Sequence, residues 1–201
     1  MQKARDRQHY LCLYLLFSAV FFVLGNLICY SLPGNASFIS QLKATVSECI
    51  TQACPISFSK TVYSFMGEMK LPLFILAGAF TSKRLPLHCL AVSYSGFAKG
   101  LCSACFMSLL KEGVLTARYE VLTAFCFTLL QVCTVGLFCF IGAHTIMFSK
   151  KTLFPLRFGI LLKQKSTYRF LIDILALCGI LLVIIILKHG NLTLMISSKG
   201  M

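Results

Sequence analysis

The chain has 201 residues, of which 58% are apolar and 12% are charged. Its mean hydropathy is +0.83, whereas about a quarter of the residues in a soluble domain are charged. The composition therefore excludes a soluble domain. It predicts a single membrane domain over residues 1–201, built as an all-α bundle of membrane-spanning helices.

The net charge of +13 arises from 19 basic and 6 acidic side chains. Such a charge can indicate a nucleic-acid partner, but the basic residues here stand in small groups beside apolar runs. That arrangement is typical of loops between membrane spans and of contact with anionic lipid headgroups. We therefore expect membrane lipid as a partner, and no nucleic acid.

The first predicted span covers residues 11–32, between a basic start and Pro33-Gly34. Because the apolar core of a secretory signal peptide is only about 7–15 residues long, we expect an uncleaved anchor. Residues 33–60 are polar and rich in Ser and Thr, which predicts an external loop. Pairing of Cys49 with Cys54 in this loop stays open, because their spacing is not diagnostic.

Four further spans are predicted near residues 61–82, 86–110, 121–148 and 170–187. The first of these four is interrupted by Glu68, Lys70 and Pro72, so it is either a full crossing or a half-helix that folds back. Residues 149–169 mix basic and apolar side chains. This mixture predicts a cytoplasmic segment at the membrane interface.

The number of basic residues in each loop bears on the orientation. Five crossings with the N-terminus inside place 11 Lys and Arg inside and 7 outside, when Lys99 is left out. Four crossings, with residues 71–80 re-entrant and the N-terminus outside, give the same counts. Three basic residues precede the first span and none follows it until Lys43. We therefore expect five crossings, with the N-terminus inside and the C-terminus outside.

The span at 86–110 carries Lys99 near its middle. A cation at that depth costs roughly 2.5–3.5 kcal/mol, so it faces a partner or a wet cavity unless its long side chain reaches the interface. Its candidate polar partners are Glu68, Glu120, Asp173 and the carbonyl of Gln131. Since Arg169 lies one turn before Asp173, we expect these two to form a local ion pair instead.

Small residues recur at every fourth position of the same span, at Gly96, Gly100, Ala104 and Ser108. Residues four apart lie on one side of a helix, and small side chains there let a neighbouring backbone approach closely. We therefore predict that this side packs against another helix.

No pattern in the sequence predicts catalysis, a metal site or a cofactor. Cys102 and Cys105 form a C-x-x-C, but a redox pair of this kind needs a helix N-terminus to lower the thiol pKa, and these two lie in mid-span. The spacing of His and Cys matches no zinc site, and there is no nucleophile elbow, phosphate loop or H-E-x-x-H pair. We expect a protein that is not an enzyme.

The central span and its flanks resemble the stage II sporulation protein M family. Phe97-Ala98-Lys99-Gly100, followed by Ala104 and Ser108, is similar to the family's Lys-Gly-x-x-x-Gly-x-x-x-Gly core. The resemblance extends over nearly the whole chain, to Phe148-Ser149-Lys150-Lys151 and the basic segment before the last span. The chain departs from the family pattern at two core glycines, which are Ala104 and Ser108, and at Gln131, which lacks the family's preceding proline.

The resemblance implies a multi-pass scaffold of the bacterial cytoplasmic membrane. In this family the partners are septal peptidoglycan hydrolases, an amidase and endopeptidase and a lytic transglycosylase, and the complex thins septal peptidoglycan during forespore engulfment. A second hypothesis is a small transporter or permease subunit with Lys99 in its pathway, because transporters place broken helices near a midplane site. A third, a thiol-based redox protein, depends on Cys102 and Cys105.

Overall fold

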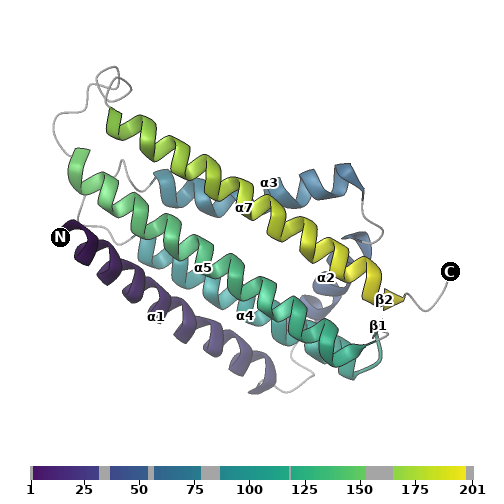
Figure 1. Ribbon diagram of the computed structural model, residues 1–201. Helices are drawn as coiled ribbons and strands as arrows, with labels where there is room; N and C mark the ends of the chain where they lie inside the picture. The colour runs from purple at the N-terminus through teal and green to yellow at the C-terminus, as the bar shows by residue number, and fades with distance from the viewer. Residues whose placement is uncertain are drawn as a thin grey trace.

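The structure is a computed structural model that describes residues 2–31, 37–53, 57–77, 87–117, 119–152 and 165–197. Within these ranges the chain forms six helices and one pair of two-residue strands (Figure 1). The elements are α1 (Gln2–Ser31), α2 (Ser37–Ala53), α3 (Phe58–Ala77), α4 (Leu87–Lys111), β1 (Thr116–Ala117), α5 (Glu120–Thr152), α7 (Lys165–Met195) and β2 (Ile196–Ser197). The prediction of an all-α bundle is confirmed.

Four of these helices are long and apolar enough to cross a membrane. The four segments are Gln8–Ser31, His88–Lys111, Glu120–Phe148 and Tyr168–Thr193. They correspond to four of the five predicted spans. The remaining predicted span, 61–82, is helical over its described part as α3, but α3 carries three charged side chains, Lys60, Glu68 and Lys70, and is not among these four.

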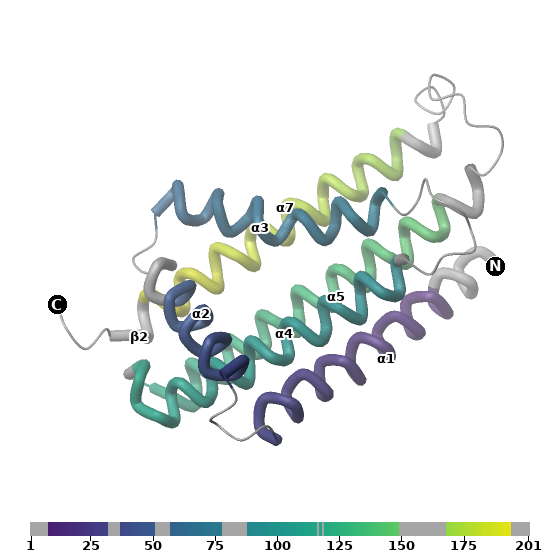
Figure 2. The backbone as a smooth tube through the Cα atoms, turned by 180° about the vertical axis from the view of Figure 1, so that it is seen from behind, coloured from purple at the N-terminus to yellow at the C-terminus, as the bar shows by residue number. Residues whose placement is uncertain are grey.

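The helices α1 and α4 run side by side in the same direction (Figure 2). Ser18 of α1 lies against Gly96 of α4. One turn further along both helices, Phe22 lies against Gly100, so the two helices are parallel. The chain returns between them through α3, which runs back from the end where α2 lies (Figures 1 and 2). The helix α5 is antiparallel to α4, and α7 is antiparallel to α5.

The most enclosed span is that of α4, with 61% of its residues buried, against 17% for α1. It packs against α1, α2, α3 and α5. The side of α1 that faces away from the bundle is apolar and exposed, as at Leu16 and Val23, which suits contact with lipid chains. The segment that carries Lys99 and the small-residue ladder is therefore the core of the bundle.

The segment predicted as an external loop, residues 33–60, contains the 17-residue helix α2, which the sequence argument did not predict. An apolar stripe at Ile39, Leu42, Val46 and Ile50 recurs every three or four residues. Ile39, Val46 and Ile50 are buried, and α2 packs on α3, α4 and α7 at one end of the bundle. The prediction of a loop was based on the many Ser and Thr residues of this segment, which lie on the other side of α2, and did not take the spacing of the apolar residues into account.

Local sequence signals fix two helix ends. The Ser57 hydroxyl accepts a hydrogen bond of 3.2 Å from the backbone N–H of Lys60, which caps the start of α3. At the end of α4, Gly113 has φ +69°, and its N–H donates to Leu110 while that of Val114 donates to Leu109. This pair of backbone hydrogen bonds is the Schellman motif, which favours glycine at the left-handed position.

The basic segment predicted at residues 149–169 is described only at its two ends. The helix α5 continues to Thr152 and α7 begins at Lys165. Residues 153–164 lie outside the described residues, as does Cys54 in the segment before α3. The interfacial position of this segment stays a prediction.

Candidate functional site

A partly open cavity of about 420 Å³ lies between α2, α3, α4, α5 and α7. Its lining residues are Thr45, Val46, Cys49, Ile50, Ser64, Gly67, Glu68, Lys99, Cys102, Phe127, Ile185, Lys188, His189 and Leu192. Each of the five helices contributes, so the cavity exists only when the bundle is assembled. The charged members of the lining are one carboxylate and two lysines, together with a histidine.

The ammonium group of Lys99 in α4 forms an ion pair and hydrogen bond with the carboxylate of Glu68 in α3. The two side chains are only 16% and 22% exposed. Glu68 is one of the three acids that the sequence offered as partners, and the pair makes it unnecessary for Lys99 to reach the membrane surface. The ion pair ties the more polar helix α3 to the core of the bundle.

A second lysine, Lys188 of α7, lines the same cavity. Its Nζ atom lies 5.3 Å from the centroid of the Phe127 ring of α5, within the range of a cation–π contact. The sequence argument missed Lys188 because it ended the last span at residue 187. Helix α7 continues beyond that point to Met195. The apolar Leu192 in this part of the sequence is the signal that could have extended the span, and the structure buries its side chain.

His189, the next residue in α7, is 4% exposed and also lines the cavity. Its Nδ1 atom is buried and has no hydrogen-bond partner among the described residues. A buried polar atom of this kind costs free energy unless a water or a ligand satisfies it. One residue of the lining, His189, therefore has a ring nitrogen that lacks a partner among the described residues.

The side chain of Gln131 in α5 is buried, with 1% exposed. Its Nε2 atom donates a hydrogen bond of 3.7 Å to Sγ of Cys102, which lines the cavity. Gln131 thus holds the Cys102 side of α4 against α5. Among the described side chains, the carbonyl of Gln131 forms no hydrogen bond with Lys99, although the sequence offered it as a partner.

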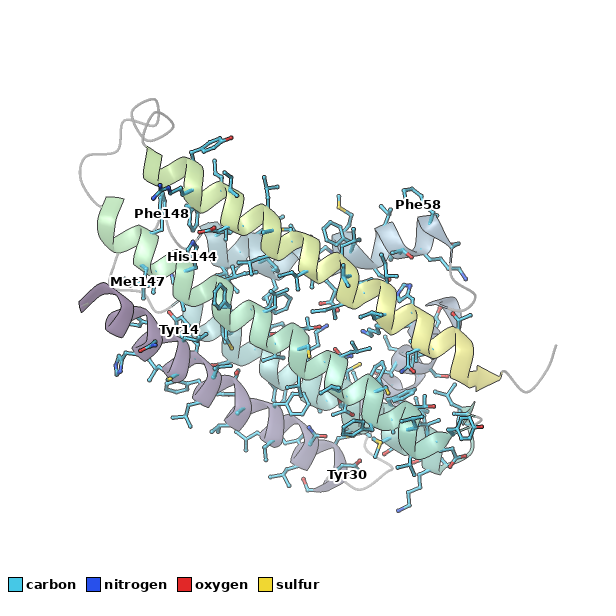
Figure 3. The ribbon with its side chains drawn as sticks, in the orientation of Figure 1. Tyr14, Tyr30, Phe58, His144, Met147 and Phe148 are labelled. Atoms are coloured by element: carbon cyan, nitrogen blue, oxygen red, sulfur yellow. The ribbon has the colours of Figure 1, made fainter. Side chains whose placement is uncertain are left out.

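Asp173 lies away from this cavity, near the opposite end of α7. Its Oδ2 atom is 3.1 Å from Nε2 of His144 in α5, so its partner belongs to the neighbouring helix. The prediction of a local pair between Asp173 and Arg169 is therefore wrong, because the ion pairs of the described residues do not include it. The reason is the aromatic stacking that brings the His144 ring beside α7. Its centroid is 5.4 Å from that of Phe170. Figure 3 labels His144 on α5, near the end where α7 begins.

The predicted packing side of α4 lies against α1 over its first half. A Cβ atom added to Gly96 or to Gly100 would lie less than 3.0 Å from backbone atoms of Ser18 or Phe22. Ala104 is completely buried and belongs to the apolar cluster that contains Cys29 of α1. Ser108 is half-buried, and its carbonyl accepts the Glu112 N–H at the end of α4.

Within the part of the chain that the structure describes, no group of three or more His, Cys, Asp or Glu residues could hold a metal ion. The ten described cysteines are free thiols. Cys105 of the C-x-x-C lies with its Sγ atom 3.6 Å from that of Cys29, and both residues are buried. No protein-family model, curated protein or solved structure matches this chain.

Proposed function

We propose that this protein is a non-enzymatic membrane scaffold that resembles stage II sporulation protein M. In this proposal it recruits or stabilises septal peptidoglycan hydrolases in the bacterial cytoplasmic membrane during forespore engulfment. The observation that carries the proposal is the backbone contact of α1 with Gly96 and Gly100, in the segment where the resemblance is strongest. Close contact of two backbones gives a bundle of fixed shape, as a platform for partners requires.

The direction of the helices supports five crossings. Because α1 and α4 are parallel, the end of α1 and the start of α4 lie at opposite ends of the bundle (Figure 2). If both helices cross the membrane, the chain between them must cross back, and α3 connects these two ends. With three basic residues before the first span, the N-terminus is inside and the C-terminus outside.

The same topology puts α2 on the outer face of the membrane, where cell-wall enzymes act. Helix α2 is fixed there by its buried stripe and by an ion pair of 2.5 Å between Lys43 and Glu112, which follows α4. Its exposed side includes Phe38, which is 57% exposed. We expect hydrolase partners to contact this side of α2.

The scaffold role is tested by purifying the tagged protein from its own sporulating host and identifying captured peptidoglycan hydrolases. We expect capture by the natural chain and by Gly136→Leu, because Gly136 has open space around its Cα. Gly100→Leu should lose capture, since the added side chain forces α4 away from α1. Absence of any hydrolase, together with normal engulfment in a deletion strain, would refute the scaffold.

The cavity beside Lys99 favours a second candidate, a small transporter or permease subunit. Its lining brings Lys99, from the middle of α4, together with Glu68 and Lys188, and transporters use charged sites between helices in this way. In vesicles, Lys99→Met should then abolish a solute or ion flux that Lys111→Met leaves intact. A pure scaffold gives no flux with either chain.

A further inference from the structure

The charges that line the cavity do not balance. In their ordinary ionised forms, Lys99 and Lys188 bring two positive charges and Glu68 brings one negative charge. Glu68 is engaged by Lys99, so the charge of Lys188 is left over, partly stabilised by the Phe127 ring. We infer that the cavity binds an oxyanion of single negative charge, a phosphodiester or a phosphate group in its monoanionic form. This inference does not depend on the scaffold function.

Electrostatics favours such an occupant. An unbalanced charge inside a bundle is poorly solvated and interacts strongly with an ion of opposite sign, because the effective dielectric constant is low. A monovalent anion would bring the cavity to neutrality. Lysine ammonium groups are common phosphate ligands, since they act as compact point charges with three donors.

The remaining polar lining suits an oxyanion as well. The imidazole of His189 lines the cavity, and a ring nitrogen that carries a proton donates to an anionic oxygen. The hydroxyl group of Ser64 also lines the cavity. Lys188, His189 and Ser64 thus offer donors from two helices, α7 and α3, to the same space.

The size of the cavity limits the occupant. A volume of about 420 Å³ is many times the roughly 30 Å³ that one water molecule occupies, which is room for a phosphate group and several attached atoms. Two sources supply this group. One is the headgroup of an anionic phospholipid, which enters through the open side, and the other is a small soluble phosphate. Basic pockets between membrane helices are known to suit lipid phosphates.

Binding is measured on the full chain by thermal unfolding. One arm titrates inorganic phosphate against chloride at constant ionic strength in neutral detergent. The other arm compares phosphatidylcholine nanodiscs with and without phosphatidylglycerol. We expect saturable stabilisation in at least one arm, and the responding arm identifies the source: phosphate for a soluble ligand, phosphatidylglycerol for a lipid.

Charge variants of the lining give the matched controls. Lys188→Met should weaken binding roughly tenfold to a hundredfold, whereas Lys188→Arg and the exposed Lys111→Met should bind as the natural chain does. Glu68→Gln should strengthen binding, because it raises the positive charge of the cavity. The inference is overturned if neither arm stabilises the natural chain, or if Lys188→Met is stabilised as much as Lys111→Met. If Lys188→Met does not fold, an unchanged affinity of Glu68→Gln overturns it instead.

Discussion

The backbone carbonyl of Phe22 in α1 lies directly against Gly100 of α4, so close that a Cβ atom at position 100 would overlap it. One turn earlier Ser18 meets Gly96 in the same way, and on the other helix Gly25 meets the backbone of Phe97. Glycines from both helices thus form the contact. Helix α1 also packs on α5, where the ring of Tyr14 lies against Gly142, and the glycine contacts hold it against α4.

We expect Gly100→Ala to destabilise the protein by about 1–3 kcal/mol, the usual cost of overpacking. The added methyl group meets backbone, which cannot rotate away as a side chain can, so α1 must move outward. Thermal unfolding in detergent measures the effect.

Gly136→Ala in α5 is the matched control, because nothing lies within 4 Å of its added Cβ. Alanine there should be neutral or stabilising by up to about 1 kcal/mol, through helix propensity. Equal unfolding temperatures for the two variants would contradict the close contact between α1 and α4.

The sequence allowed the bundle and the small-residue ladder to be predicted, because both depend on patterns within one helix. Apolar length identifies a span, and a four-residue period identifies the packing side of α4. The partner of that side could not be predicted, since it depends on α1 and α4 running parallel. Gly25 is not part of a four-residue repeat of small residues, so the sequence did not identify it as the third glycine in the contact between α1 and α4.

The candidate site shows the same limit. Lys99 stands out because it interrupts a span, and Glu68 was one of three possible partners. Lys188 and His189 escaped notice because they follow Leu187, where the predicted span ends, and so resemble the polar end of a span. Their place in the cavity depends on α7 continuing to Met195 beside α2, a relation between elements far apart in the chain.

The lysine excess in the cavity predicts unequal costs for breaking the Lys99–Glu68 pair. Glu68→Met leaves two buried ammonium groups without a carboxylate and should cost about 3–5 kcal/mol. Lys99→Met should cost less, about 1–3 kcal/mol, because Lys188 remains in the cavity to face Glu68.

A double-mutant cycle completes this test. The chain with both Lys99→Met and Glu68→Met should be more stable than Glu68→Met alone, since one buried charge is removed with its partner. Unfolding temperatures of the four proteins, measured in one detergent, give the coupling free energy. Additive effects of the two substitutions would mean that the pair contributes no coupling.

The Lys43–Glu112 pair predicts a stability change at alkaline pH. The hydrogen bond to Glu112 raises the pKa of Lys43 above its ordinary value of 10.5. A raised pKa means that the folded protein holds this proton more tightly than the unfolded chain does. The pair therefore stabilises the protein fully below about pH 10.5, and the stabilisation is lost as the pH rises through the folded value.

Lys43→Met should lower stability near neutral pH by less than about 1 kcal/mol, because the Glu112 side chain is 49% exposed and solvent screens the pair. The difference between the two proteins should shrink above pH 10.5. Unfolding temperatures between about pH 8 and pH 11 measure it. A difference that grows with pH would have the wrong sign for this pair.

The parallel arrangement of α1 and α4 predicts that the two ends of the chain lie on opposite sides of the membrane. A green fluorescent protein fused before the N-terminus should fluoresce in the cytoplasm, and an alkaline phosphatase fused after the C-terminus should be active outside. A phosphatase fused after Thr152, at the end of α5, is the control and should be inactive, because five crossings put this end inside. If the C-terminal phosphatase were also inactive, the number of crossings would be even, and α3 could not be the helix that carries the chain back from α1 to α4.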